Sequence, residues 1–259
     1  PKPQNPSKLK NIPTLFYNVL YIFSFLSLIL IQFSNYKDKN LTHMDSLPAA
    51  TQLLKTLFEQ PDADWDQCVD EDSGPNHVTG FRRINNEGKP STHMQIKLRE
   101  TYPEVTPDQF WELATNMDKR VVWDAERLAG YEVLGEGENG GTVVYSQGKK
   151  PAVPLVSARD TVLNTWKDEV NLGEGRRAFI WTSVEHEKKP ATSAFVRANA
   201  EVLATIVEAN PGGGTLVNEF RSIDVGGQML AMAIDKGSKM GPKRNFEAWC
   251  VGVAGKKWE

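Results

Sequence analysis

The segment 116–166 contains two apolar runs, TVVY at positions 142–145 and VLNTW at positions 162–166. Both runs are rich in β-branched and aromatic residues, so each predicts a strand. Pro151 and Pro154 lie between them, and prolines at these positions exclude a helix, so the connection is expected to be extended. The segment therefore predicts two consecutive, largely buried strands.

Charged residues border these strands. Arg120 and Asp124 lie in a polar turn before the first strand, and Arg159 is followed by Asp160 at the start of the second. Buried charge is costly unless it is paired or meets a ligand. We therefore expect two charged pairs here, and these positions are the first candidates for a functional site.

Further strands and two helices are expected outside this segment. A helix is expected at 47–60, and Thr106-Pro107-Asp108-Gln109 marks the start of another, with a hydroxyl cap, proline at the first position and glutamine at the third. The expected strands are 65–69, 77–84, 92–99, 131–134, 142–147, 157–170, 176–185, 201–208 and 215–223.

The closing segment 225–250 has apolar residues at helical spacing and predicts a helix interrupted near Gly241-Pro242. About nine strands in successive hairpins form a curved antiparallel sheet, and a long terminal helix can lie in its hollow. The layout is therefore α+β.

The composition describes an ordinary globular protein, with 259 residues, 40% hydrophobic and 24% charged. The net charge of -3 argues against a nucleic-acid partner, because such proteins need positive charge to neutralise phosphates. The four histidines and two cysteines show no metal spacing, and no set of residues typical of a nucleophilic catalyst stands out. We expect no metal and no cofactor.

The first 45 residues differ from the rest of the chain. Residues 14–33 are almost continuously apolar, and about 20 such residues are what a helix needs to cross a bilayer. This stretch is either a membrane anchor or the product of a misassigned start, while residues 46–255 form the folded domain. We expect a cytoplasmic, membrane-associated protein, with a single membrane span if the anchor is real.

The glycine pattern at 135–140, GEGENG, matches a dinucleotide-binding motif. A strand follows it where that motif needs a helix, and its glutamates would repel pyrophosphate, so we interpret it as a hairpin. A large sheet with apolar faces and few reactive groups indicates a container for an apolar ligand.

Five segments resemble, in order, the landmarks of the START (steroidogenic acute regulatory protein-related lipid transfer) domain. The resemblance covers roughly residues 47–249, and it implies a helix-grip fold, as in START and Bet v 1-like proteins, around a lipid-sized tunnel. The segments are NMDKRVVWD at 116–124, YEVL at 131–134, TVVY at 142–145, SARD at 157–160 and DVGGQ at 224–228.

Within that family the chain is most similar to the phosphatidylcholine transfer type, in which the arginine equivalent to Arg120 meets the lipid phosphate. The ceramide transfer type has an arginine and a carboxylate at Arg120 and Asp124. Ser146 stands where these relatives have tryptophan or glutamine, and Trp181 where the ceramide type has asparagine. Thr165 replaces the cavity arginine of the sterol type, so a sterol would lose one expected contact.

The residue chemistry is consistent with these roles. A phosphodiester in an apolar tunnel needs a fixed cation, and a guanidinium offers two parallel donors; the alternative for Arg120 is an ion pair with Asp124. Alternation along 157–166 leaves open whether the Arg159 face or the Trp166 face points to the tunnel. The expected lipid-binding residues are Arg120, Trp123, Asp124, Tyr145, Ser146, Arg159, Leu163, Trp181, Met229 and Ala233.

The leading hypothesis is a monomeric, non-catalytic protein that binds and transfers one lipid, with phospholipid favoured. One alternative is a grip-fold enzyme acting on a hydrophobic substrate, with Asp124, Asp160 or His186 as acid or base; another is a sterol- or ceramide-sensing module. The terminal helix is the expected lid. Four basic residues could dock it transiently on a membrane surface, although they could also form an ordinary solvated face: Lys236, Lys239, Lys243 and Arg244.

Overall fold

The computed structural model describes residues 47–84, 88–151, 156–167, 172–173, 175–227, 229 and 231–257. The chain divides into two units, 1–42 and 43–259, and the described residues all belong to the second. The apolar segment 14–33 lies outside the described residues. Within the described ranges, no helix is long and apolar enough to span a bilayer.

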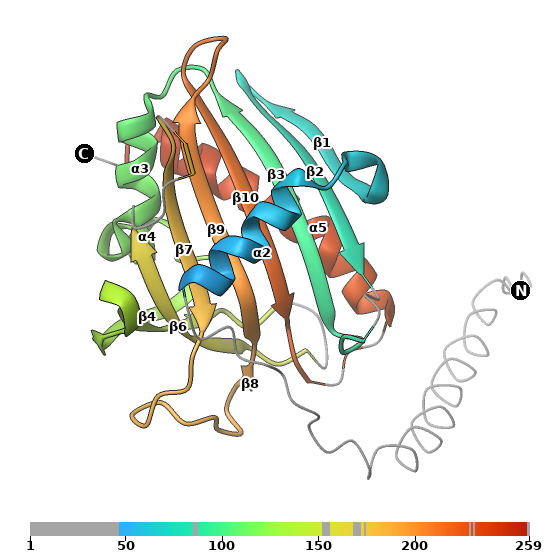
Figure 1. Cartoon of the computed structure of the whole chain (residues 1–259), viewed down its shortest axis with the longest axis vertical. Helices are drawn as coiled ribbons and strands as arrows, with labels where there is room; N and C mark the ends of the chain where they lie inside the picture. The colour runs from blue at the N-terminus through green and yellow to red at the C-terminus, as the bar shows by residue number, and fades with distance from the viewer. Residues whose placement is uncertain are drawn as a thin grey trace, which may run out of the picture. The chain divides into compact units, whose positions relative to one another are not determined.

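One curved sheet organises the second unit, and its strands follow the order β1-β2-β3-β10-β9-β7-β6-β5-β4 (Figure 1). Neighbours along this path are antiparallel, and the short strand β8 pairs with β6 in parallel. The strands are β1 Asp66–Ser73, β2 Asn76–Ile84, β3 His93–Tyr102, β4 Leu128–Glu136, β5 Thr142–Gly148, β6 Arg159–Lys167, β7 Arg177–Ser183, β8 Val196–Arg197, β9 Asn199–Ala209 and β10 Thr215–Asp224. The nine expected strands are confirmed, and β8 was not expected.

Helices cover both faces of the sheet. Figure 1 shows α2 crossing the near face and α5 lying behind the strands. The helices are α2 Leu47–Glu59, α3 Pro107–Thr115, α4 Met117–Trp123 and α5 Ala231–Ala254, with 3₁₀ turns η1 Asp62–Asp64 and η2 Glu138–Gly140. This is the expected α+β helix-grip layout.

Two hydrophobic clusters fix these helices to the sheet. On the outer face, Leu54 and Leu57 of α2 pack in a cluster with Trp166 and Ile180. On the inner face, Trp249 of α5 belongs to a larger cluster with residues of α3 and β3. Because both faces are covered, β6 buries Trp166 outward while its other face can line an interior space.

Two expected elements differ from the structure. The polar turn at 117–124 is the short helix α4, and Asn116 caps it by accepting a hydrogen bond from the amide of Lys119 at 3.1 Å. The terminal helix begins at Ala231 and continues through Pro242 without the expected interruption. Pro242 is buried, so packing holds the helix together where a proline would favour a break.

The expected hairpin at 135–140 is confirmed as the β4–β5 connection. Gly137 and Gly141 both face the Asn164 side chain, and a Cβ at either position would lie within 2.3 Å of Oδ1 of Asn164. The glycines are thus required by a close contact between the hairpin and β6. A dinucleotide loop is therefore not the reason for the pattern.

Candidate functional site

A cavity of about 580 Å³ lies between the inner face of the sheet and α5. This volume is typical of small-ligand sites, which span roughly 300 to 1,000 Å³. Much of the wall is apolar, contributed by β3, β5, β6, β7, β9, β10 and α5. The apolar residues include Met94, Ile96, Val144, Leu163, Trp181, Leu203, Ile223, Met229, Ala233 and Ile234.

The structure brings eight of the ten expected site residues to the cavity wall: Arg120, Asp124, Ser146, Arg159, Leu163, Trp181, Met229 and Ala233. The other two do not line it. Tyr145 points to the opposite face of β5 from Ser146, and its hydroxyl lies 3.1 Å from Oδ2 of Asp160. Trp123 packs against Trp249 in the core, with ring centroids 5.7 Å apart.

Arg120 presents a guanidinium to the cavity. Its Cζ lies 4.3 Å from the centroid of the Trp249 ring, a cation–π geometry. Its Nε is 3.5 Å from Oδ2 of Asp124, a long contact, and among the described residues this is its one hydrogen-bond acceptor. Burial, together with the charge of Arg127, lowers the pKa of Arg120 to about 10, so the group stays charged at neutral pH.

Asp124 is held mainly by Arg127, which the sequence reading missed. Nε of Arg127 donates to Oδ1 of Asp124 at 2.7 Å, and Nη2 donates to Oδ2 at 2.5 Å. Nη1 of Arg127 donates to Oδ1 of Asn245 in α5 at 2.5 Å. The expected Arg120–Asp124 pair is therefore secondary, and Arg120 retains donors for a ligand.

A second ion pair lies on β10. Glu219 accepts from Trp249 Nε1 at 2.8 Å, from Asn245 Nδ2 at 2.9 Å and from Arg221 Nη2 at 2.5 Å. Burial alone would raise the pKa of Glu219, but the charge of Arg221 and these hydrogen bonds lower it. The carboxylate therefore stays ionised, and α5 is tied to the sheet beside Arg120.

The expected Arg159–Asp160 pair is wrong, because adjacent residues of a strand point to opposite faces. Asp160 instead accepts from Arg197 at 2.9 and 3.0 Å. Arg159 donates to the backbone carbonyls of Ser157, Val225 and Gly226 at 2.5, 3.2 and 3.4 Å. Burial lowers the pKa of Arg159, and it has no acidic partner among the described residues.

The four basic residues expected to dock on a membrane lie on α5, but they are not equivalent. Lys239 pairs with Asp235 at 3.2 Å and Lys243 pairs with Glu71 at 2.6 Å. Lys236 and Arg244 are exposed, and within the described ranges neither has a carboxylate partner. These two are therefore available to an outside partner.

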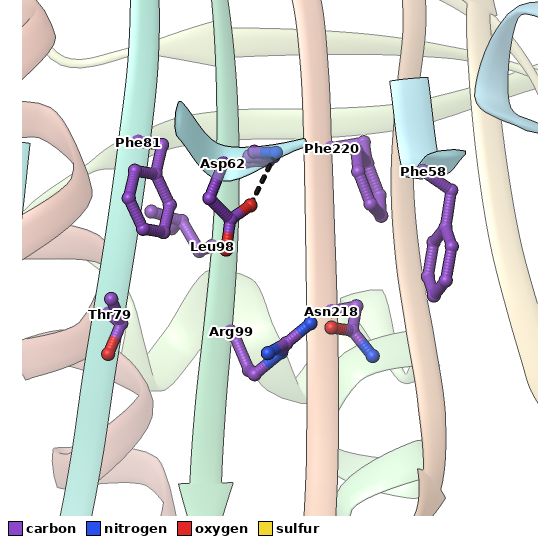
Figure 2. A pocket seen from close by; sticks show the side chains of 9 residues that line it. Phe58, Asp62, Thr79, Phe81, Leu98, Arg99, Asn218 and Phe220 are labelled. Carbon is purple, nitrogen blue, oxygen red and sulfur yellow. Dashed lines mark ion pairs between the residues drawn. The ribbon is translucent and has the colours of Figure 1, made fainter. Parts of the chain in front are cut away.

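A smaller hollow of about 110 Å³ lies on the outer face (Figure 2). Phe58, Phe81 and Phe220 form its apolar walls, and Asp62, whose ion pair is dashed in Figure 2, pairs with Lys97 at 2.5 Å. It holds only a few water-sized volumes. The inner cavity is thus the candidate site.

Solved structures share this architecture at low sequence identity. Human StAR-related lipid transfer protein 5 aligns with a TM-score of 0.65 and 20% identity, covering 78% of this chain and 93% of that one. Human STARD10 aligns with a TM-score of 0.64 and 15% identity, covering 80% of each chain. The lipid transfer and protein localization domain of human StarD13 gives 0.51 and 16%, covering 75% and 95%.

Sequence comparison gives the family itself. No curated protein matches the chain significantly. The family model of the START domain matches residues 46–241, which is more than half of the chain and includes the whole sheet and the first half of α5. The chain therefore belongs to the START domain family.

Proposed function

We propose that this protein binds one lipid in the cavity under α5 and transfers it between membranes without changing it chemically. The observation that carries the proposal is the wall itself, which is apolar over much of its area and offers the incompletely paired guanidinium of Arg120. Acyl chains would bury against the apolar part because removing apolar surface from water is favourable. Membership of the START family supports this function.

A phospholipid is the favoured ligand. A phosphate taken into this cavity needs a cation already in place, and Arg120 is fixed over Trp249 with free donors. The sterol alternative has less support, because Thr165 does not line the cavity and its hydroxyl donates to the carbonyl of Thr142 at 3.0 Å. The ceramide alternative would place its polar groups beside Trp181, an apolar part of the wall.

The catalytic alternative also has little support. Asp124 is held by Arg127 and Asp160 by Arg197, so both carboxylates are neutralised by cations. His186 lies outside the cavity wall. A general acid or base needs a poised group within reach of the substrate, and these three candidates do not provide one.

The first half of α5 would serve as the lid. It covers the cavity through Ala233, Ile234 and Gly237, and Met229 lines the cavity just before the helix. In the second half Asn245 and Trp249 also reach the cavity, but Phe246 and Trp249 are buried in the core. Of the first half only Ile234 belongs to the inner hydrophobic cluster, against Phe246, Trp249 and Cys250 of the second, so the first half is the easier to release. Lys236 in the first half and Arg244 just beyond it would orient α5 toward an anionic bilayer, each contributing about 1 kcal/mol.

We further propose that residues 46–255 act as one monomeric domain at the cytoplasmic side of a membrane, docked transiently. Native mass spectrometry of the full chain, in detergent if the segment 14–33 requires it, tests the function. After incubation with phospholipid vesicles, the expected spectrum shows one added lipid mass per chain. Human StAR-related lipid transfer protein 5 is run in parallel as a folded control. A chain that never carries lipid under these conditions would contradict the proposal.

A further inference from the structure

Three hydroxyl groups form a row across adjacent strands on the cavity wall. Tyr131 of β4 lies directly opposite Ser146 of β5, and Ser146 lies directly opposite Thr161 of β6. Directly opposed residues share a face of the sheet, with Cβ atoms about 4.5 to 5.5 Å apart. All three residues line the cavity and are half-buried.

The hydrogen-bonding capacity of this row is unused. None of the three hydroxyls has a hydrogen-bond partner among the described residues. Each can both donate and accept a hydrogen bond. Burial, with a contribution from Asp118, raises the pKa of Tyr131 to about 12, so this hydroxyl keeps its proton at neutral pH. The row can therefore bind an oxygen-rich group that both donates and accepts.

The row also marks a boundary on the wall. Leu163 and Arg159 each lie two residues from Thr161 along β6, on the same face of the strand and in opposite directions. The cavity wall carries five basic residues, Arg120, Arg127, Lys149, Arg159 and Arg221, against the acidic residues Asp124, Asp160 and Glu219. The cavity wall as a whole is therefore net positive.

We infer that the ligand is an anionic phospholipid whose head group carries free hydroxyls, such as a glycerol or inositol phosphodiester. This inference rests on the proposed function and specifies its ligand. The phosphate meets Arg120 and the head-group hydroxyls meet the row. A choline head group fits worse, because its trimethylammonium forms no such hydrogen bonds and is repelled by the basic wall. The Trp249 face that could bind it already carries Arg120.

A competition experiment tests the inference on the full chain. The protein is incubated with vesicles containing equal amounts of phosphatidylglycerol, phosphatidylinositol and phosphatidylcholine with identical acyl chains, and the bound lipids are measured by native mass spectrometry. We expect either hydroxylated anionic lipid to exceed phosphatidylcholine at least about tenfold. Equal occupancy, or a preference for phosphatidylcholine, overturns the inference but leaves lipid binding intact, whereas no bound lipid of any kind contradicts the proposed function itself.

Removing the hydroxyls tests whether the row causes the preference for hydroxylated head groups. Tyr131→Phe, Ser146→Ala and Thr161→Val should each reduce it about two- to tenfold, the value of one hydrogen bond, without weakening phosphatidylcholine binding. Tyr145→Phe is the matched control, because that hydroxyl lies on the other face of β5 and should not alter the preference. Thermal unfolding confirms that each variant is folded. An undiminished preference in the folded triple variant would show that the row does not recognise the head group.

Discussion

Nη2 of Arg82 lies 2.7 Å from Oδ1 of Asp235, and this ion pair fastens the first half of α5 to β2. The same guanidinium donates to the backbone carbonyl of Asp235 at 2.9 Å and to the hydroxyl of Ser238. Arg82 is buried, whereas Asp235 is partly exposed. The contact therefore acts as a clamp at the edge of the proposed lid.

Weakening this clamp should open the lid more often. We expect Asp235→Asn to speed lipid exchange several-fold and to increase hydrogen exchange of the amides in 231–241 relative to those in 245–254. Lys239→Gln is the control, because it removes the exposed partner of Asp235 and leaves Arg82 in place. Unchanged hydrogen exchange in both segments would show that this ion pair does not govern opening of the lid.

Substitutions at Arg120 and Arg127 should have different effects, the first on ligand binding and the second on stability. Arg120→Leu is expected to abolish phospholipid transfer while thermal unfolding shifts by only a few degrees, because Asp124 keeps its bidentate partner. Arg127→Leu leaves the buried carboxylate of Asp124 with only the long contact to Arg120, and should cost about 3 to 5 kcal/mol of unfolding free energy. Transfer assays and thermal melts of both variants check this pair. An Arg120→Leu protein that unfolds readily, and transfers lipid once refolded, would assign Arg120 a structural role.

Membrane docking should depend on the two unpaired bases of α5. Transfer from vesicles with anionic lipid is expected to be faster than from neutral ones, and 0.5 M salt should remove the difference by screening. Lys236→Gln with Arg244→Gln should have the same effect. The matched control is Lys239→Gln with Lys243→Gln, because these residues are already in ion pairs. Equal rates on both vesicle types at low salt would exclude this role for α5.

Glu100 should make stability fall as pH rises. Burial, followed by the charge of Glu219, raises the pKa of Glu100 to about 8 from an ordinary value of 4.5. Because the folded protein holds this proton more tightly than the unfolded chain, the stabilisation is complete below about pH 4.5 and is lost as pH rises toward 8. Glu100→Gln, which stays neutral, should raise the melting temperature by roughly 2 to 4 °C or more at pH 8 and have little effect at pH 4.5. Calorimetry at the two pH values measures this, and an equal shift at both would show that ionisation of Glu100 is not the cause.

Local sequence signals were sufficient for much of the fold. The Thr106–Gln109 capping box forms as expected, with the two reciprocal hydrogen bonds at 3.0 and 3.3 Å. Such a motif is decided by four neighbouring residues, so a single sequence contains all the information. The orientation of β6 could not be predicted in this way. Helices cover both sides of the sheet, so periodicity alone could not decide whether the Leu163 face or the Trp166 face points to the cavity.

The site was predictable only in part, for a reason of distance along the chain. Arg197 reaches Asp160 across 37 residues, and no local pattern indicates such a pair. The placement of Tyr145 on the wall was a different error: it was expected there together with Ser146, although alternation along a strand forbids both. The wall's hydroxyl row became visible only once the register of β4, β5 and β6 was known.

Helix α5 continues past the end of the family match, and this bears on where the domain ends. The match to the START family stops at residue 241, whereas Asn245 and Trp249, which bind the buried carboxylate of Glu219, follow it. A protein cut at the family boundary would leave Glu219 with Arg221 alone and would open the core around Phe246. The cooperative unit is therefore longer than the recognisable one, and a shortened form of this protein should keep the chain at least to Ala254.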